Sequence, residues 1–271
     1  LVMNGPGQSL SWGWGGFVRP IVIISFITDW RLYGRWWPGY HLTNLLWHVA
    51  ASLGAAWVVG ECTRLCRYGP YTRRCAVVAG LAFAVWAPHT EAVAWVSGRT
   101  DVIATALAFA GFALSLRIVR GAEGQAWAIP LATGLFAVAL LAKESVVPLV
   151  LLWVWALVIV RPLSRGHWIR VGAHAALCMA LLFGYFMLRK QVLGTWLGGY
   201  GNQVHTNLDI RHIIKCIALF GMRIASPPWP FPRDGAWHAA GAGFAWFVLA
   251  TVAATAAGVC VVRAWRQASV Q

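Results

Sequence analysis

The feature that most constrains the fold is a series of long apolar segments that carry few or no charges. Hydrophobic residues make up 59% of the 271 residues, and charged residues only 11%. A helix needs roughly 20 apolar residues to cross a hydrocarbon layer about 30 Å thick, and several segments approach that length. Their apolarity is continuous rather than alternating, which favours helices over a membrane β-barrel. The sequence therefore predicts an all-α, polytopic integral membrane protein.

Seven segments are expected to span the membrane, and a shorter one is expected to lie at its surface. Residues 20–33 are apolar but short and are flanked by tryptophans and arginines, which is typical of an interfacial helix. The expected spans are residues 40–60, 75–88, 102–116, 127–142, 145–160, 171–188 and 244–262. We therefore expect a single transmembrane domain over residues 1–271, which comprises an outer loop and interfacial helix (1–39), a six-span core (40–188), a long outer loop (189–243), and a last span with its tail (244–271).

The basic residues predict the orientation of these spans. A net charge of +14 would suggest nucleic-acid binding in a soluble protein, but here the arginines cluster in short loops between spans. The loops after spans one, three, five and seven hold eleven arginines, whereas the two short opposite loops hold only Arg99 and Lys143. By the positive-inside rule, residues 88–101 and 189–243 therefore face the periplasm or a lumen. The six cysteines form no CxxC pair, so no zinc ribbon or disulfide framework is indicated.

One polar segment, residues 88–101, lies between two predicted spans and carries His89, Glu91, Arg99 and Asp101. Ionisable groups beside a membrane are costly unless they pair or serve a ligand. In a structural interpretation, Glu91 complements a helix dipole and Asp101 caps the next helix. In a functional interpretation, the carboxylates accept a proton or hold a metal, and Arg99 binds an anion. We expect the chemistry in this segment.

Other candidates lie in and beside the apolar segments, and each also has a purely structural interpretation. Lys143 and Glu144 could neutralise each other in a hairpin turn, or Lys143 could bind phosphate near Arg99. His41, Asn44 and His48 share one helical face, which favours hydrogen bonds between helices, and only His41 lies near the outer end.

Two further candidates follow the sixth predicted span. Arg189 could be a snorkelling anchor or could grip an anionic headgroup. Tyr200 lies among glycines that permit either a tight turn or a close approach of backbone to a sugar. No HExxH, GxSxG, Walker or GxGxxG pattern is present, so soluble-enzyme chemistry is not indicated.

Four segments, taken in order, resemble the GT-C membrane glycosyltransferases, in the branch that contains the transmembrane and tetratricopeptide-repeat O-mannosyltransferases and their bacterial relatives. The segments are RP (19–20), GYHLTNLLWH (39–48), HTEAVAWVSGRTD (89–101) and AKE (142–144). The third is quite specific. The likeness covers residues 19–160 and is looser beyond residue 189.

The resemblance implies an inverting enzyme that moves a sugar from a polyprenyl- or dolichyl-phosphate carrier to a protein or glycan acceptor on the outer face of the membrane, and the named branch suggests mannose as that sugar. Glu91 and Asp101 are the expected catalytic residues. The expected substrate-binding residues are His41, His89, Arg99, Lys143, Glu144, Arg189 and Tyr200. No cofactor is assigned, and a divalent cation at the site is an alternative. The expected location is the bacterial inner membrane, or the endoplasmic reticulum in a eukaryote.

The chain departs from the family pattern in two places. Relatives carry a first transmembrane helix, and then the base in the first outer loop, so we expect both upstream of Leu1 and the sequence to be N-terminally incomplete. Asp29 matches a helix position rather than that base, and residues 86–88 lack the His-Pro of relatives. The alternatives are a transporter or flippase for an anionic lipid or solute, and a non-catalytic GT-C-like protein. A transporter would place its charges near mid-bilayer on broken helices, whereas this sequence places them at helix ends.

Overall fold

The computed structural model describes residues 19–66, 69–86, 89–121, 127–148 and 165–194. The chain divides after residue 204, and all of these residues lie in the first unit. Within them the secondary structure is helical, with no strand, which confirms the predicted all-α class. Tyr200, the predicted span 244–262 and nearly all of the predicted span 145–160 lie outside the described residues.

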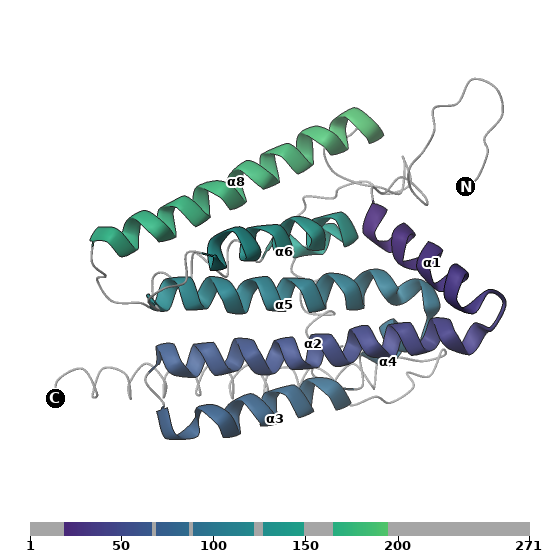
Figure 1. Ribbon diagram of the computed structural model, residues 1–271, viewed down its shortest axis with the longest axis horizontal. Coiled ribbons are helices and arrows are strands. Elements are labelled where there is room, and N and C mark those ends of the chain that lie inside the picture. The colour runs from purple at the N-terminus through teal and green to yellow at the C-terminus, as the bar shows by residue number, and fades with distance from the viewer. Residues whose placement is uncertain (1–18, 67–68, 87–88, 122–126, 149–164, 195–271) are drawn as a thin grey trace, which may run out of the picture. The chain divides into compact units, whose positions relative to one another are not determined.

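Seven α-helices are described, with three short 3-10 helices between them (Figure 1). The α-helices are α1 (Pro20–Tyr33), α2 (Trp37–Leu65), α3 (Thr72–Val85), α4 (His89–Ala94), α5 (Arg99–Arg120), α6 (Ala128–Ala142) and α8 (Arg165–Leu193). The 3-10 helices are η1 (Gly69–Tyr71), η2 (Val96–Gly98) and η3 (Glu144–Val146).

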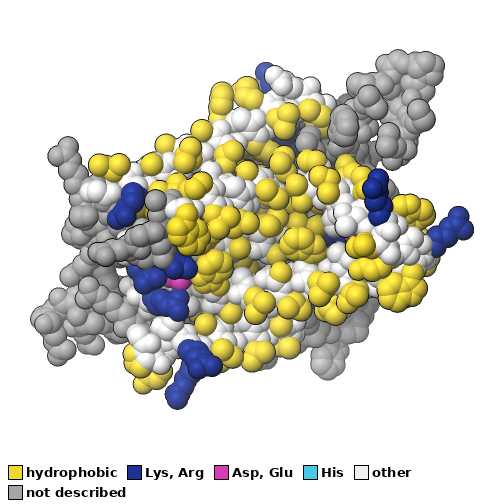
Figure 2. Space-filling view, in the orientation of Figure 1, with side chains coloured by type: hydrophobic (Ala, Val, Ile, Leu, Met, Phe, Trp, Pro, Cys, Tyr) yellow, Lys and Arg dark blue, Asp and Glu magenta, His cyan; other side chains and the backbone are white. Residues whose placement is uncertain are grey.

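Three of these helices are long and apolar enough to cross a membrane: Trp37–Leu65, Val96–Arg120 and Trp168–Leu193. Helix α6 is apolar but shorter, and α3 has only 14 residues. Large hydrophobic side chains such as Leu53 and Phe183 are exposed on the helix surfaces, as expected for residues that face lipid. On the face shown in Figure 2, hydrophobic side chains cover the middle of the helices and most basic side chains gather near their ends. The chain is an all-α membrane protein, and its crossing the membrane seven times stays a prediction.

Helix α5 is the centre of the packing. It lies between α2 and α6, while α3 packs against α2, and α8 packs against both α5 and α6 (Figure 1). Small residues let these helices approach closely. A Cβ atom added to Gly111 would lie 3.3 Å from the carbonyl oxygen of Ala132 in α6. A buried polar group ties three helices together, because His174 of α8 lies 2.8 Å from the Ser115 hydroxyl and 3.1 Å from that of Thr133.

Helix α1 covers the end of the bundle at which α2 and α5 begin and α6 ends (Figure 1). It has the bounds predicted for the interfacial segment, with Pro20 in its first turn and Gly34 after its end at a φ of 56°. The turn into α2 is tight, since a Cβ atom on Gly39 would lie 2.3 Å from the Tyr33 ring. We call this end of the helices the site end, and the end at which α2 and α5 finish the opposite end.

Candidate functional site

The most buried charged group at the site end is the Arg99 guanidinium, whose side chain is 0% exposed. Its Nη1 lies 2.6 Å from Oδ2 of Asp29. Its Nε donates to Oδ1 of Asn44 at 2.7 Å, and its Nη2 donates to the backbone carbonyl of Tyr40 at 2.8 Å. The guanidinium carbon also lies 4.4 Å from the centre of the Phe26 ring. We call this set of side chains, from α1, α2 and α5, the Arg99 network.

The chain just before Arg99 is shaped to bring it into this position. A Cβ atom on Gly98 would lie 2.6 Å from the carbonyl oxygen of Ala92, so only glycine lets η2 pass this close to α4. The Nδ2 amide group of Asn44 donates to the carbonyl oxygen of Trp95 at 3.2 Å, and the Oδ1 atom of Asn44 accepts from Arg99. Asn44 therefore couples the turn before α5 to the buried arginine.

This placement changes the interpretation of Arg99. The sequence suggested an anion-binding residue in an outward-facing loop, whereas the guanidinium points into the protein and its buried partner is Asp29, only 3% exposed. A buried ion pair is tolerated when further hydrogen bonds satisfy both groups, and removing one partner is then very destabilising. The observed contacts fit a residue that holds α1, α2 and α5 together.

A second charged group lies where α6 ends. The backbone of Lys143 is extended, with φ of −160° and ψ of 135°, so that α6 stops and Glu144 turns away from it. The Lys143 ammonium forms an ion pair with Asp101 in the first turn of α5. Glu144 instead pairs with Arg19, just before α1, at 3.1 Å. The interpretation that Lys143 and Glu144 neutralise each other in a turn is therefore wrong, because each side chain reaches a different element.

The side chains of these two ion pairs are partly exposed to solvent, whereas those of Arg99 and Asp29 are buried. The Asp101 side chain is 46% exposed and that of Lys143 is 25% exposed. Helix α8 adds Arg189, which is buried, and Tyr185, whose phenol is close enough to Arg189, Glu144 and Arg19 for electrostatic interaction. We call the set formed by Arg19, Asp101, Lys143, Glu144 and Arg189 the charged corner. It brings acids and bases from four separate parts of the chain to one place.

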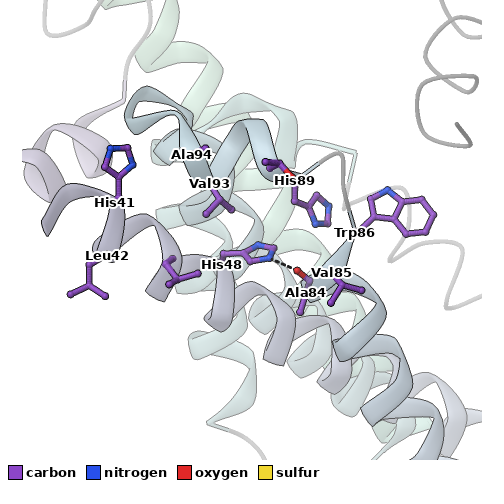
Figure 3. A pocket seen from close by; sticks show the side chains of 11 residues that line it. His41, Leu42, His48, Ala84, Val85, Trp86, His89, Val93 and Ala94 are labelled. Carbon is purple, nitrogen blue, oxygen red and sulfur yellow. Dashed lines mark hydrogen bonds between the residues drawn. The ribbon is translucent and has the colours of Figure 1, made fainter. Parts of the chain in front are cut away.

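A third group, the histidine cavity, lies between α2, the end of α3, and α4 (Figure 3). The cavity has a volume of about 440 Å³ and is lined by His41, His48, Trp86 and His89, among others. His48 donates from Nε2 to the carbonyl oxygen of Ala84 at 3.1 Å. The cavity wall is mostly apolar, and the rings of His41, His48 and His89 lie at separate places around it.

The protonation of His89 follows from its contacts. Its Nδ1 lies 3.0 Å from the carbonyl oxygen of Phe83, which can only accept, so the proton lies on Nδ1 and Nε2 is left as an acceptor. Burial lowers the pKa of His89, the carbonyl contact opposes this, and nearby His48 lowers it further. His89 is therefore neutral at pH 7.

The predicted site residues thus lie in separate places. Arg99 belongs to the buried network; Asp101, Lys143, Glu144 and Arg189 meet in the charged corner; His41 and His89 line the histidine cavity. Glu91 is exposed on α4 and makes no ion pair within the described part of the chain. In the same part of the chain, no group of three His, Cys, Asp or Glu residues is placed to hold a metal ion.

Sequence reasoning missed some members of these groups. The sequence marks Arg19 only as part of an RP pair that resembles relatives, and it gives no signal for Tyr185 because an isolated tyrosine is common in a membrane helix. Asp29 was assigned to a helix position, which the structure confirms, but its pairing with Arg99 was not foreseen.

Over about half its length the chain is similar to protein O-mannosyl-transferases of animals. It is 32% identical over 139 residues to Protein O-mannosyl-transferase TMTC4 of Homo sapiens, a match that covers 47% of this chain and 19% of the relative. It is 33% identical over 138 residues to Protein O-mannosyl-transferase Tmtc1 of Drosophila melanogaster, covering 51% of this chain and 15% of the relative.

The match therefore spans less than a fifth of the length of these relatives. No protein-family model matches the chain. No solved structure matches it either. Together with the all-helical fold, the comparisons confirm the resemblance that the sequence motifs indicated: in about half of its residues, this chain is similar to the TMTC protein O-mannosyl-transferases.

Proposed function

We propose that this protein is a glycosyltransferase that moves a sugar from a lipid-phosphate carrier to an acceptor at the site end of its helices. The observation that carries the proposal is the charged corner, where acids and bases, all partly exposed except the buried Arg189, converge at one end of an all-helical membrane protein. The relatives, which are named O-mannosyl-transferases, support mannose as the sugar and a protein hydroxyl as the acceptor.

Transfer needs a carboxylate that removes the proton of the acceptor hydroxyl while that oxygen attacks the sugar. Asp101 is the better placed of the two predicted acids, because it lies in the corner, is nearly half exposed, and is in the first turn of α5. A carboxylate there is also favoured by the positive end of the helix dipole. Glu91 is exposed on α4 and is the second candidate.

The leaving group is a lipid phosphate, and preorganised cations stabilise the charge that develops on it. Lys143 and the buried Arg189 are the cations proposed for this role, and Glu144 pairs with Arg19 in the same corner. A phosphate that binds Lys143 competes with its partner Asp101. Arrival of the donor would therefore free the carboxylate for the acceptor, which couples donor binding to activation of the acceptor.

The Arg99 network is proposed to position this site rather than to contact the substrate. Arg99 and Asp101 both belong to the first turn of α5, so the contacts of Arg99 with α1 and α2 fix where that turn lies. His41 and His89 line the cavity under α4, which offers an apolar wall and a ring-nitrogen acceptor to a substrate group. Tyr200, which lies outside the described residues, stays a predicted substrate contact.

The site end is proposed to face the periplasm or a lumen, with a polyprenyl or dolichyl phosphate as the carrier. Among the short loops that join predicted spans, those at the opposite end hold Arg64, Arg73, Arg74, Arg117 and Arg120, whereas those at the site end hold Arg99 and Lys143, as the positive-inside rule expects if the opposite end is cytoplasmic. The charged residues described lie at the two ends of the helices, which supports an enzyme over a transporter. The bacterial inner membrane or the endoplasmic reticulum would both suit this arrangement.

The proposal can be tested by following transfer of labelled mannose from polyprenyl-phosphate mannose in membranes that contain the full chain. Asp101→Asn should lower transfer at least about 100-fold, because it removes a base without changing the shape of the side chain. The matched control is Arg31→Gln, which changes an exposed residue of α1 at the same end. Transfer that is unaffected by Asp101→Asn and by Glu91→Gln would overturn the assignment.

A further inference from the structure

A second cavity, with a volume of about 680 Å³, lies at the opposite end between α2 and α3. Trp57, Gly60 and Arg64 of α2 form one wall, and Arg73 and Val77 of α3 lie in the other. The cavity is far along α2 from the residues proposed for sugar transfer, and no predicted site residue lines it. We call it the inner groove.

The absence of a side chain at Gly60 keeps the groove open. Further along the same pair of helices, a Cβ atom on Gly80 would lie only 3.0 Å from the Cβ atom of Ala56, which shows close packing. A Cβ atom on Gly60 would lie 3.6 Å from that of Ala76, which is ordinary contact, and 3.9 Å from the Arg64 guanidinium. A larger side chain at residue 60 would therefore extend into the cavity.

The groove lies at the depth where a membrane changes from hydrocarbon to headgroups. Helix α2 has 29 residues, about 43 Å at 1.5 Å per residue, which exceeds a hydrocarbon layer of about 30 Å. Arg64 in its last turn and Arg73 in the first turn of α3 are therefore at headgroup level. Trp57 and Val77 lie one to two turns deeper. The groove has a charged rim and an apolar floor.

The end of the helices that surrounds the rim carries an excess of positive charge. The buried carboxylate of Glu61 is shared by three arginines, since it lies 2.8 Å from Arg64, 3.2 Å from Arg120 and 3.9 Å from Arg117. One carboxylate cannot neutralise three guanidinium groups. Arg73 adds a further charge, because it is exposed and makes no ion pair within the described part of the chain.

We propose that the inner groove binds an anionic phospholipid, with the headgroup phosphate between Arg64 and Arg73 and an acyl chain along Trp57 and Val77. The charged rim selects an anion, since basic pockets between membrane helices bind acidic headgroups. The apolar floor selects a lipid rather than a free anion, because a soluble phosphate would leave that surface uncovered. The groove would thereby anchor the α2–α3 pair to an acidic leaflet, whatever reaction takes place at the site end.

Native mass spectrometry of the full chain, purified in neutral detergent and titrated with phosphatidylglycerol or phosphatidylcholine, tests this proposal. Phosphatidylglycerol should bind at least about fivefold more tightly than phosphatidylcholine, as expected for one arginine at a membrane surface. Arg73→Gln should weaken phosphatidylglycerol binding about fivefold. Arg74→Gln is the matched control, because it removes the same charge from the next residue, which does not line the groove, and it should change binding less than twofold.

A second variant separates the groove from general electrostatic attraction. Gly60→Leu keeps the charge and narrows the groove beside Trp57 and Val77, so it should weaken phosphatidylglycerol binding more than Arg74→Gln does, with a melting temperature within a few degrees of the wild type. Equal losses in Arg73→Gln and Arg74→Gln would overturn the proposal, because they would indicate attraction to a basic surface. Full displacement of the lipid by millimolar inorganic phosphate would also overturn it, since a free anion would then be the preferred occupant.

Discussion

Two charged groups meet in the first turn of α5, and they differ in almost every physical respect. Arg99 is 0% exposed, and three of its nitrogens bind Asp29, Asn44 and the Tyr40 carbonyl. Asp101, two residues later, is 46% exposed and pairs with Lys143 across a surface corner. Two residues on a helix correspond to about 200° of rotation, so the two side chains point to opposite sides of α5.

This contrast separates charged groups that stabilise the fold from charged groups that can exchange their partner for a substrate. In the Arg99 network, the donors already have protein partners, so a ligand would have to displace a buried carboxylate or a backbone carbonyl. In the charged corner, the pairs are partly solvated and contribute little to stability, and exchanging a partner for a substrate group therefore costs little. We expect the fold to depend on the first group and the reaction on the second.

The largest effect should come from breaking the buried network. Arg99→Ala would leave Asp29 as a buried charge without its partner, which typically costs 3–5 kcal/mol. Arg99→Lys keeps the charge but loses the forked geometry, so its loss should be intermediate. The loss of stability in each variant can be measured by unfolding the protein in a mild detergent that is titrated with a denaturing one. An Arg99→Ala protein as stable as wild type would show that the network is not structural.

A smaller effect is expected at Gly98, which lets η2 pass close to α4. Gly98→Ala places a Cβ atom 2.6 Å from the carbonyl oxygen of Ala92, and forcing such an overlap typically costs about 1–3 kcal/mol. The same unfolding titration measures it, with Gly134→Ala as a control at a helical glycine where a Cβ atom meets nothing within 4 Å. Equal stabilities for the two variants would contradict the close approach.

The charged corner should show much smaller effects on stability. Glu144→Gln breaks the ion pair with Arg19 at 3.1 Å, both of whose side chains are partly exposed. Exposed pairs of this kind are worth about 0–1 kcal/mol, so the unfolding midpoint should barely move. A loss close to that of Arg99→Ala would remove the distinction between the two groups.

The smallest effect concerns pH and the histidine cavity. Burial lowers the pKa of His89 in the folded protein below its usual value near 6.5. The neutral form is favoured on folding, so this contribution is fully present above about pH 6.5 and is lost as the pH falls toward the folded pKa. His89→Gln should therefore flatten the acid side of a plot of melting temperature against pH. An unchanged slope would show that a group other than His89 determines the loss of stability at acid pH.

The sequence predicted most of the local structure, because local signals determine it. Helix α1 begins at Pro20 and ends before Gly34, as a proline in the first turn and a glycine after the last residue predict. The polar stripe on α2 predicted hydrogen bonds between helices, and Asn44 and His48 do bond to backbone carbonyls outside α2. These features depend on the spacing of a few neighbouring residues.

The pairing of charges could not be predicted in the same way. Lys143 and Asp101 are 42 residues apart, and Arg19 and Glu144 are 125 residues apart. Which partner each finds depends on how α1, α5 and α6 pack, and packing of helices is not local. For the same reason, the sequence could not show that Arg99 is buried and Asp101 exposed, since both lie in one polar segment.

The most direct test of the account measures binding of polyprenyl phosphate to the full chain in vesicles that contain excess phosphatidylglycerol, which occupies the inner groove. Because a charge-assisted hydrogen bond contributes roughly 1.5–3 kcal/mol, Lys143→Gln should weaken binding about 10- to 100-fold. The unfolding midpoint should stay unchanged, and Arg31→Gln at the same end should bind as wild type does. Equal affinity of Lys143→Gln and wild type for polyprenyl phosphate would contradict the claim that the exposed corner meets the substrate.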